Sequence, residues 1–263
     1  GLASLGVQKG SKIAILSTNC SRWALADYAI IGIGGVTVTV YPTLTNPQIK
    51  YIYDDSEAVY AFVGNKEQLK KTRSLLQDCE QMKMYILMDD SEADTDNVMS
   101  FNTLLEKGKK YKESANFSLK EMANSIKPGD LLTLIYTSGT TGNPKGAMLS
   151  HNNLVSNIKS GKKSIQVGEN DVLLSFLPLS HVFERMVGHF TGLSSGGSVY
   201  YAESIDKVAD NMGEVKPTIM ASVPRLYEKM YAKILDKVSN DPILRQKIFW
   251  WAIGVGKESM PFI

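Results

Sequence analysis

Short apolar runs alternate with helical patterns along most of this 263-residue chain. The runs have the length and flanking turn residues of buried strands, and the stretches between them have helical spacing. Strands that alternate with helices predict an α/β fold with mainly parallel sheets flanked by helices. Strands are expected at 12–16, 36–40, 58–63, 84–88, 131–136, 146–150, 172–176, 198–201 and 218–222, and helices at 21–33, 47–56, 66–77, 152–160, 182–194, 206–214 and 225–239.

The composition changes between residues 91 and 127, where the strand pattern weakens and the segment begins acidic and polar. A chain of this length can hold one large domain or two small ones, with ample core. We therefore predict two partial α/β subdomains, residues 1–127 and 128–263, with the second carrying the segment described next.

The run 131–136 leads directly into a segment rich in glycine and hydroxyl side chains that ends in a lysine. Glycine lets backbone N–H groups approach phosphate oxygens, hydroxyl groups donate further hydrogen bonds, and lysine supplies a positive charge. The segment therefore predicts a polyphosphate-binding loop. Its candidate ligands are Thr137, Ser138, Gly139, Thr140, Thr141, Gly142 and Lys145.

The spacing of this loop differs from a Walker A site, in which the lysine directly follows a glycine and precedes Ser or Thr. Here Asn143 and Pro144 separate Gly142 from Lys145, and Gly146 follows the lysine. Pro144 disfavours a helix directly after the loop, so we expect the loop to close a hairpin with the next strand. The alternative is an ordinary flexible surface loop.

A second group of polar residues recurs with helical spacing. His181, Glu184, Arg185 and Gly188 fall at i, i+3, i+4 and i+7, which places them on one stripe of the expected helix. A solvated face with a local contact between Glu184 and Arg185 is the alternative to a binding surface. A separate apolar stripe is expected to face the core and consists of Val182, Met186, Phe190 and Leu193.

The bulk composition excludes several classes of protein. A net charge of +2 gives no strong field for nucleic acid, so no nucleic-acid partner is expected. The two cysteines, Cys20 and Cys79, have neither a disulfide framework nor metal-ligand spacing, which favours reduced thiols and a cytoplasmic location. No apolar run reaches the roughly 18 residues of a membrane-spanning helix. Peripheral membrane association and the oligomeric state stay open.

Several motifs resemble one superfamily. Tyr136–Gly146 resembles the phosphate-loop signature of acyl-adenylate-forming enzymes, which include acyl-CoA synthetases, luciferases and peptide-synthetase adenylation domains. Within 175–185, Pro-Leu-Ser-His is similar to the acyl-pocket motif of the superfamily, and His-Val-Phe-Glu-Arg is similar to long-chain fatty acyl-CoA synthetases. Segments 41–45, 223–229 and 249–257 agree with that branch. The resemblance covers essentially the whole chain and implies part of the large N-terminal domain.

The resemblance implies a long-chain fatty acid–CoA ligase that uses ATP, Mg²⁺ and CoA. The fatty carboxylate would attack the α-phosphorus of ATP to give acyl-AMP and pyrophosphate, and the CoA thiol would then displace AMP. The loop would hold the β- and γ-phosphates, with Thr137 or Thr140 reaching the metal. The implied substrate residues are His181, Glu184 and Gly188.

Other parts of the family pattern are missing from the sequence. The segment Tyr-Gly-x-Thr-Glu, the ribose-binding Asp and the lysine-bearing C-terminal domain are not found, and the leading strands are absent. The resemblance therefore implies a chain truncated at both ends, with unknown catalytic residues and no activity as an isolated fragment. Two alternatives stay open. One is an adenylating ligase for an aromatic, short-chain or amino acid, and the other is a non-catalytic nucleotide-binding module.

Overall fold

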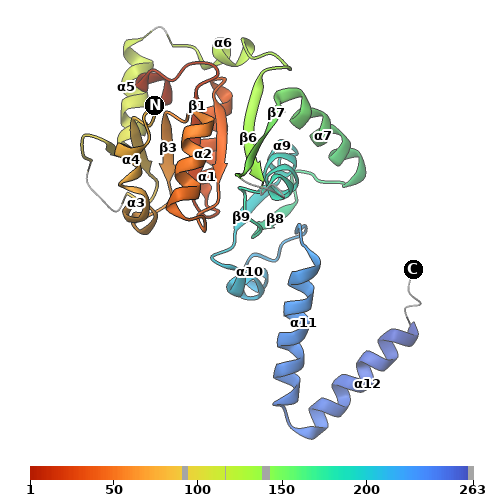
Figure 1. Ribbon diagram of the computed structural model, residues 1–263. Coiled ribbons are helices and arrows are strands. Elements are labelled where there is room, and N and C mark those ends of the chain that lie inside the picture. Colours follow the sequence, from red (N-terminus) through yellow and green to blue (C-terminus); the bar gives the residue numbers. More distant parts are fainter. Residues whose placement is uncertain (91–93, 116, 138–142, 260–263) are drawn as a thin grey trace. The chain divides into compact units, whose positions relative to one another are not determined.

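The computed structural model describes residues 1–90, 94–115, 117–137 and 143–259 (Figure 1). The chain forms two compact units, residues 1–221 and 222–263. The first unit contains both sheets and every residue of the candidate site described below. The predicted subdomain boundary at residue 127 does not coincide with a break in the main sheet, because strands from both sides of it pair with each other. That boundary stays a prediction.

The main sheet has seven strands in the order β5-β4-β3-β1-β2-β6-β7. Neighbouring strands run parallel except β7, which pairs antiparallel with β6. This arrangement confirms the predicted α/β class with a mainly parallel sheet. The strands are β1 Lys12–Leu16, β2 Val36–Val40, β3 Tyr60–Val63, β4 Met84–Leu87, β5 Val98–Ser100, β6 Leu131–Thr137 and β7 Lys145–Ser150.

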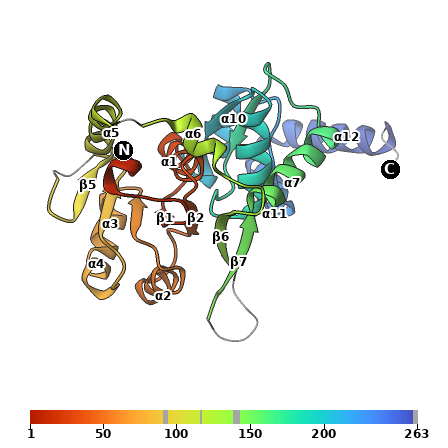
Figure 2. The ribbon, with the colours of Figure 1, turned by 90° about the horizontal axis from the view of Figure 1, so that it is seen from above.

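Helices cover both faces of this sheet (Figure 2). Alternate residues of β1 point to opposite faces, so Ile13 and Ile15 belong to one core cluster and Ala14 and Leu16 to the other. Both faces are buried, which explains why the buried residues of β1, β3 and β4 are all apolar. The helices are η1 Leu2–Leu5, α1 Ser21–Gly32, α2 Asn46–Ser56, α3 Lys66–Thr72, α4 Leu75–Asp78, α5 Phe101–Ser114, α6 Leu119–Asn124 and α7 His151–Ser164.

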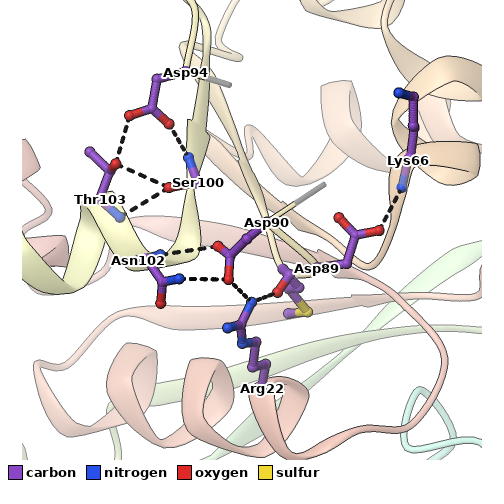
Figure 3. A network of polar contacts seen from close by, with 9 residues as sticks. Arg22, Lys66, Asp89, Asp90, Asp94, Ser100, Asn102 and Thr103 are labelled. Atoms are coloured by element: carbon purple, nitrogen blue, oxygen red, sulfur yellow. Dashed lines mark hydrogen bonds and ion pairs between the residues drawn. The ribbon is translucent and has the colours of Figure 1, made fainter. Parts of the chain in front are cut away.

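Polar side chains close the crossover between β4 and α5 (Figure 3). Asp90 Oδ2 accepts from Asn102 Nδ2 at 2.8 Å and lies 2.5 Å from Arg22 Nη1. The hydroxyl group of Thr103 donates to Asp94 Oδ2 at 2.6 Å. These contacts tie the end of β4 to α1 and fix the start of α5. The same crossover contains β5, a short strand that the sequence pattern did not predict.

A second sheet contains β8 Val172–Ser175 and β9 Ser198–Tyr201, which run parallel. The expected strand at 218–222 is wrong, since only Ile219 bridges to Leu173. Pro217 precedes this segment and has no N–H group to continue a ladder. The remaining elements of the first unit are α8 Val182–Glu184, the π-helix η2 Arg185–Thr191, α9 Gly192–Ser194, η3 Ile205–Lys207 and α10 Val208–Val215.

The second unit consists of two helices, α11 Pro224–Ser239 and α12 Ile243–Ser259. Pro224 occupies the first turn of α11, where its missing N–H group costs no helical hydrogen bond. Many large apolar side chains are exposed on this unit, including Tyr231, Trp250 and Trp251. In the described part of the chain, no helix combines the length and the apolar character needed to cross a bilayer.

Candidate functional site

A pocket of about 390 Å³ lies at the carboxyl ends of β2 and β6 and is called the β2–β6 pocket here. Ligands of open α/β sheets bind at the carboxyl ends of the strands. The walls come from β2 and the turn after it, from α2, from the β6–β7 hairpin and from the start of α8. The lining residues are Thr39, Tyr41, Leu44, Gln48, Ile52, Ile135, Tyr136, Thr137, Pro144, His181 and Val182.

The β6–β7 hairpin forms one side of this pocket and confirms the predicted hairpin. Thr137 pairs directly with Lys145 in the antiparallel ladder, and the side chains of both are exposed. Thr137 and Pro144 line the pocket. Among the ion pairs of the described residues none involves Lys145, so its charge is free to meet an anion. The predicted ligands Ser138, Gly139, Thr140, Thr141 and Gly142 lie outside the described residues.

His181 and Val182, at the start of α8, line another part of the pocket, and Asn19 holds the turn before them against the end of β1. Asn19 Nδ2 donates to the carbonyl oxygen of Leu177 at 2.7 Å, and Asn19 Oδ1 accepts from Leu179 N at 2.9 Å. His181 caps α8, since its Nδ1 accepts from Phe183 N at 3.2 Å. The structure therefore brings two predicted site residues, Thr137 and His181, to one pocket.

Two other predicted substrate residues, Glu184 and Gly188, are buried and do not line the β2–β6 pocket. Burial raises the pKa of Glu184 to about 7, although the Ser175 hydroxyl group opposes this shift. A Cβ atom on Gly188 would lie 2.4 Å from Glu184 Oε1. The space beside Gly188 therefore holds the Glu184 carboxyl group. Contact of these two residues with substrate stays a prediction.

The expected polar and apolar stripes of this helix do not match the structure. Residues 185–191 form a π-helix, whose i to i+5 spacing changes which side chains share a face. Val182, predicted for the core, is 44 % exposed, whereas Arg185 is only 2 % exposed. The alternative, a solvated face with a contact between Glu184 and Arg185, is also wrong, because both residues are buried.

Arg185 instead pairs with Asp27 of α1 in the interior of the first unit. Its Nε lies 2.9 Å from Asp27 Oδ2, and its Nη2 lies 2.5 Å from Asp27 Oδ1. Thr37 of β2 also donates to Asp27, and Thr133 of β6 accepts from Arg185, both at 2.7 Å. The pair thus fixes the helix that carries His181 to two strands that form the pocket.

The pKa of Asp27 depends on its pairing with Arg185. Burial alone would raise its pKa, but the Arg185 charge, the hydrogen bonds from Arg185 and the adjacent His189 imidazole hold the pKa well below its usual range. His189 Nε2 lies 3.3 Å from Asp27 Oδ2. Asp27 is a site residue that the motifs did not predict, although a lone carboxylate in the apolar segment 23–32 is a signal that could identify it.

A small apolar cavity of about 20 Å³ adjoins the β2–β6 pocket, and Ile135 and Val182 line both. Its other walls come from β6, β7, α7 and the π-helix. The additional lining residues are Leu132, Thr133, Leu149, Leu154, Arg185, Met186 and Phe190. The site therefore combines a polar side, formed by the hairpin, with an apolar extension.

Comparison with known proteins gives a consistent result. A family model described as AMP-binding enzyme matches residues 1–251. The chain is 32 % identical over 267 residues to the long-chain-fatty-acid–CoA ligase ACSBG2 of Xenopus laevis, covering 98 % of this chain and 36 % of that protein. It is 29 % identical over 271 residues to the peroxisomal long chain acyl-CoA synthetase 6 of Arabidopsis thaliana, covering 99 % of this chain and 37 % of that protein.

A solved structure of similar fold is the anthranilate CoA ligase AuaEII in complex with anthranoyl-AMP. The match has a TM-score of 0.71 at 22 % identity and covers 86 % of this chain and 42 % of that one. At this identity the likeness shows the fold alone. The chain spans little more than a third of the length of the two curated relatives.

Proposed function

Because the chain belongs to the AMP-binding enzyme family, we propose that it forms part of a long-chain fatty acid–CoA ligase. The proposed protein activates a fatty acid with ATP to acyl-AMP and then transfers the acyl group to CoA. The observation that supports the proposal is the pocket that both Thr137 and His181 line, because Thr137 belongs to the segment predicted to bind polyphosphate and His181 to the segment similar to the acyl-pocket motif.

In the proposed first half-reaction, a carboxylate oxygen of the fatty acid attacks the α-phosphorus of ATP. A carboxylate-oxygen-to-phosphorus bond forms, and the bond from that phosphorus to the oxygen bridging it to the β-phosphate breaks, so pyrophosphate leaves. Phosphoryl chemistry of this kind depends mainly on positioning and charge stabilisation. Lys145 is exposed in the ladder pair next to the hairpin loop and is assigned to the polyphosphate. Its ammonium group would offset the charge on the leaving pyrophosphate.

The metal assignment rests on Thr137. Mg²⁺ prefers oxygen ligands and is often held by few protein groups together with phosphate oxygens. The Thr137 side chain lines the β2–β6 pocket beside the hairpin and fits that role, whereas Thr140 lies outside the described residues. When bound, the metal would offset negative charge on the phosphates. No cluster of three or more His, Cys, Asp or Glu suited to a metal occurs among the described residues.

The apolar extension is assigned to the acyl chain. Ile135 and Val182 line both the cavity and the β2–β6 pocket, so a chain whose carboxylate lies near Thr137 would enter the cavity past these two side chains. Each buried methylene group contributes about 0.8 kcal/mol. The cavity is small, so a long chain would fit only if Met186 or Phe190 moved. This favours a second candidate, an adenylating ligase for a shorter acid.

Pyrophosphate release tests the proposal in the protein as its natural gene encodes it. We expect release with ATP and Mg²⁺ that depends on added acid, is strongest with a long-chain acid such as palmitate, and yields acyl-CoA when CoA is present. Strongest release with short, aromatic or amino acids would support the second candidate. Binding of ATP without pyrophosphate release for any acid would contradict both and favour a non-catalytic nucleotide-binding module.

A further inference from the structure

The hydroxyl group of Tyr136 links β6, one strand of the β6–β7 hairpin, to α2. It donates a hydrogen bond of 2.6 Å to Asp55 Oδ2, although the two residues are 81 positions apart in the chain. The Tyr136 ring is buried, whereas the Asp55 carboxylate is exposed. Burial and the Asp55 carboxylate both raise the pKa of Tyr136, so the hydroxyl group keeps its proton and remains the donor.

The opposite strand accommodates this ring through a glycine. Gly146 pairs with Tyr136 in the antiparallel ladder. A Cβ atom at Gly146 would lie 3.1 Å from Tyr136 Cζ and 3.4 Å from both Cε atoms, closer than side chains normally pack. The ring therefore lies across Gly146, and a side chain there would require the ring to shift by a few tenths of an ångström.

The bond joins two walls of the β2–β6 pocket. Gln48 and Ile52 of α2 line the pocket, and so does Tyr136 itself. The next pair of the ladder after Tyr136 and Gly146 is Thr137 and Lys145. The position of the Tyr136 backbone in the ladder therefore determines where Thr137 and Lys145 lie at the end of the sheet.

We propose that Asp55 and Tyr136 are positioning residues for ATP, a role that rests on the proposed function of the same pocket. Neither residue has to touch the nucleotide. The hydrogen bond holds α2 and the hairpin together, so that Thr137 and Lys145 face the polyphosphate before it binds. Such preorganisation increases affinity because less conformational freedom is lost on binding.

Two variants test this role in the protein as its natural gene encodes it. Tyr136→Phe removes only the hydroxyl group, and Asp55→Ala removes the acceptor. We expect each variant to weaken binding of Mg²⁺-ATP, measured by titration calorimetry, by roughly three- to tenfold, the loss expected for one net hydrogen bond. The double variant should bind ATP no more weakly than either single variant, because both remove the same bond.

Tyr51→Phe is the matched control. The Tyr51 hydroxyl group bonds to the other oxygen of the same carboxylate, Asp55 Oδ1, at 3.4 Å, but Tyr51 does not line the pocket. We expect the control to bind ATP like the wild type. In pyrophosphate exchange, the KM for the carboxylic acid should stay within twofold of the wild-type value in every variant.

The outcomes separate this proposal from the proposed function. Unchanged ATP affinity in Tyr136→Phe together with a lower melting temperature would mean a merely structural bond and would overturn the proposal. An equal loss in Tyr51→Phe, or additive losses in the double variant, would overturn it too. Weakened ATP binding without pyrophosphate exchange by the wild type would support the positioning role and contradict the ligase. Absence of ATP binding by the wild type would contradict both.

Discussion

Arg185 and Asp27 form a bidentate ion pair, with Nη2–Oδ1 and Nε–Oδ2 distances of 2.5 and 2.9 Å. They lie 158 positions apart in sequence, and their side chains are 3 % and 0 % exposed. Burial of two charges is costly unless each is fully paired and hydrogen-bonded. Thr37 and Thr133 supply the additional hydrogen bonds. The pair therefore specifies how the helix after His181 docks on β2 and β6.

Removal of the Asp27 charge should destabilise the fold strongly. Asp27→Asn leaves the Arg185 guanidinium group buried without its counter-charge, so we expect the free energy of unfolding to fall by about 3–5 kcal/mol in urea titration. Glu57→Gln is the matched control, because it breaks the exposed ion pair with Lys12, whose N–O distance is 2.9 Å. The control should leave the urea midpoint nearly unchanged. Equal midpoints for Asp27→Asn and wild type would contradict the prediction.

Glu184 should make the fold less stable as the pH rises. The unfolded chain loses the Glu184 proton near pH 4.5, whereas burial keeps it on the folded protein up to about pH 7. The contribution of Glu184 to the free energy of unfolding therefore falls between pH 4.5 and 7, by on the order of 2–3 kcal/mol, and is constant above that range. Glu184→Gln should remove this decrease and be more stable than wild type at pH 8. Parallel stability curves for the two proteins would refute it.

A side chain at position 188 should be unfavourable for the fold. The Cβ atom of Gly188→Ala would collide with the carboxyl end of the flexible Glu184 side chain, which must rotate away, and we expect a loss of about 0.5–1.5 kcal/mol in the free energy of unfolding. Gly213→Ala is the control, since no atom lies within 4 Å of its Cβ position in α10. It should raise stability by about 0.4–1 kcal/mol. If Gly188→Ala were as stable as wild type, Glu184 would not occupy this space.

Lys145 should affect nucleotide binding and leave the fold intact. In the complete protein, Lys145→Ala removes one charged contact to the polyphosphate, so the KM for ATP in pyrophosphate exchange should rise roughly tenfold, about 1.4 kcal/mol. The melting temperature should not change, because the side chain is exposed. Lys159→Ala, an exposed lysine on α7, is expected to behave like wild type. The same KM in both variants would remove Lys145 from the proposed site.

The local elements of the main sheet could be predicted from the sequence. The strand at 12–16 and the strand at 36–40 were predicted with their observed bounds, because short runs of apolar or β-branched residues between turn residues are typical of buried strands. The hairpin was also predicted, since Pro144 excludes a helix directly after the loop. The resemblance of 136–146 to a phosphate loop then indicated the family that the comparisons confirm.

Only the tertiary structure decided which polar side chains face the pocket and which are buried. A helical pattern placed Glu184 and Arg185 beside His181, but Arg185 turns inward to pair with the distant Asp27 carboxylate, and Glu184 is buried as well. Likewise, nothing local to Tyr136 identifies Asp55 as its partner. Spacing along the chain determines local periodicity, whereas the partner of a buried charge or hydroxyl group depends on contacts between segments 81 and 158 residues apart.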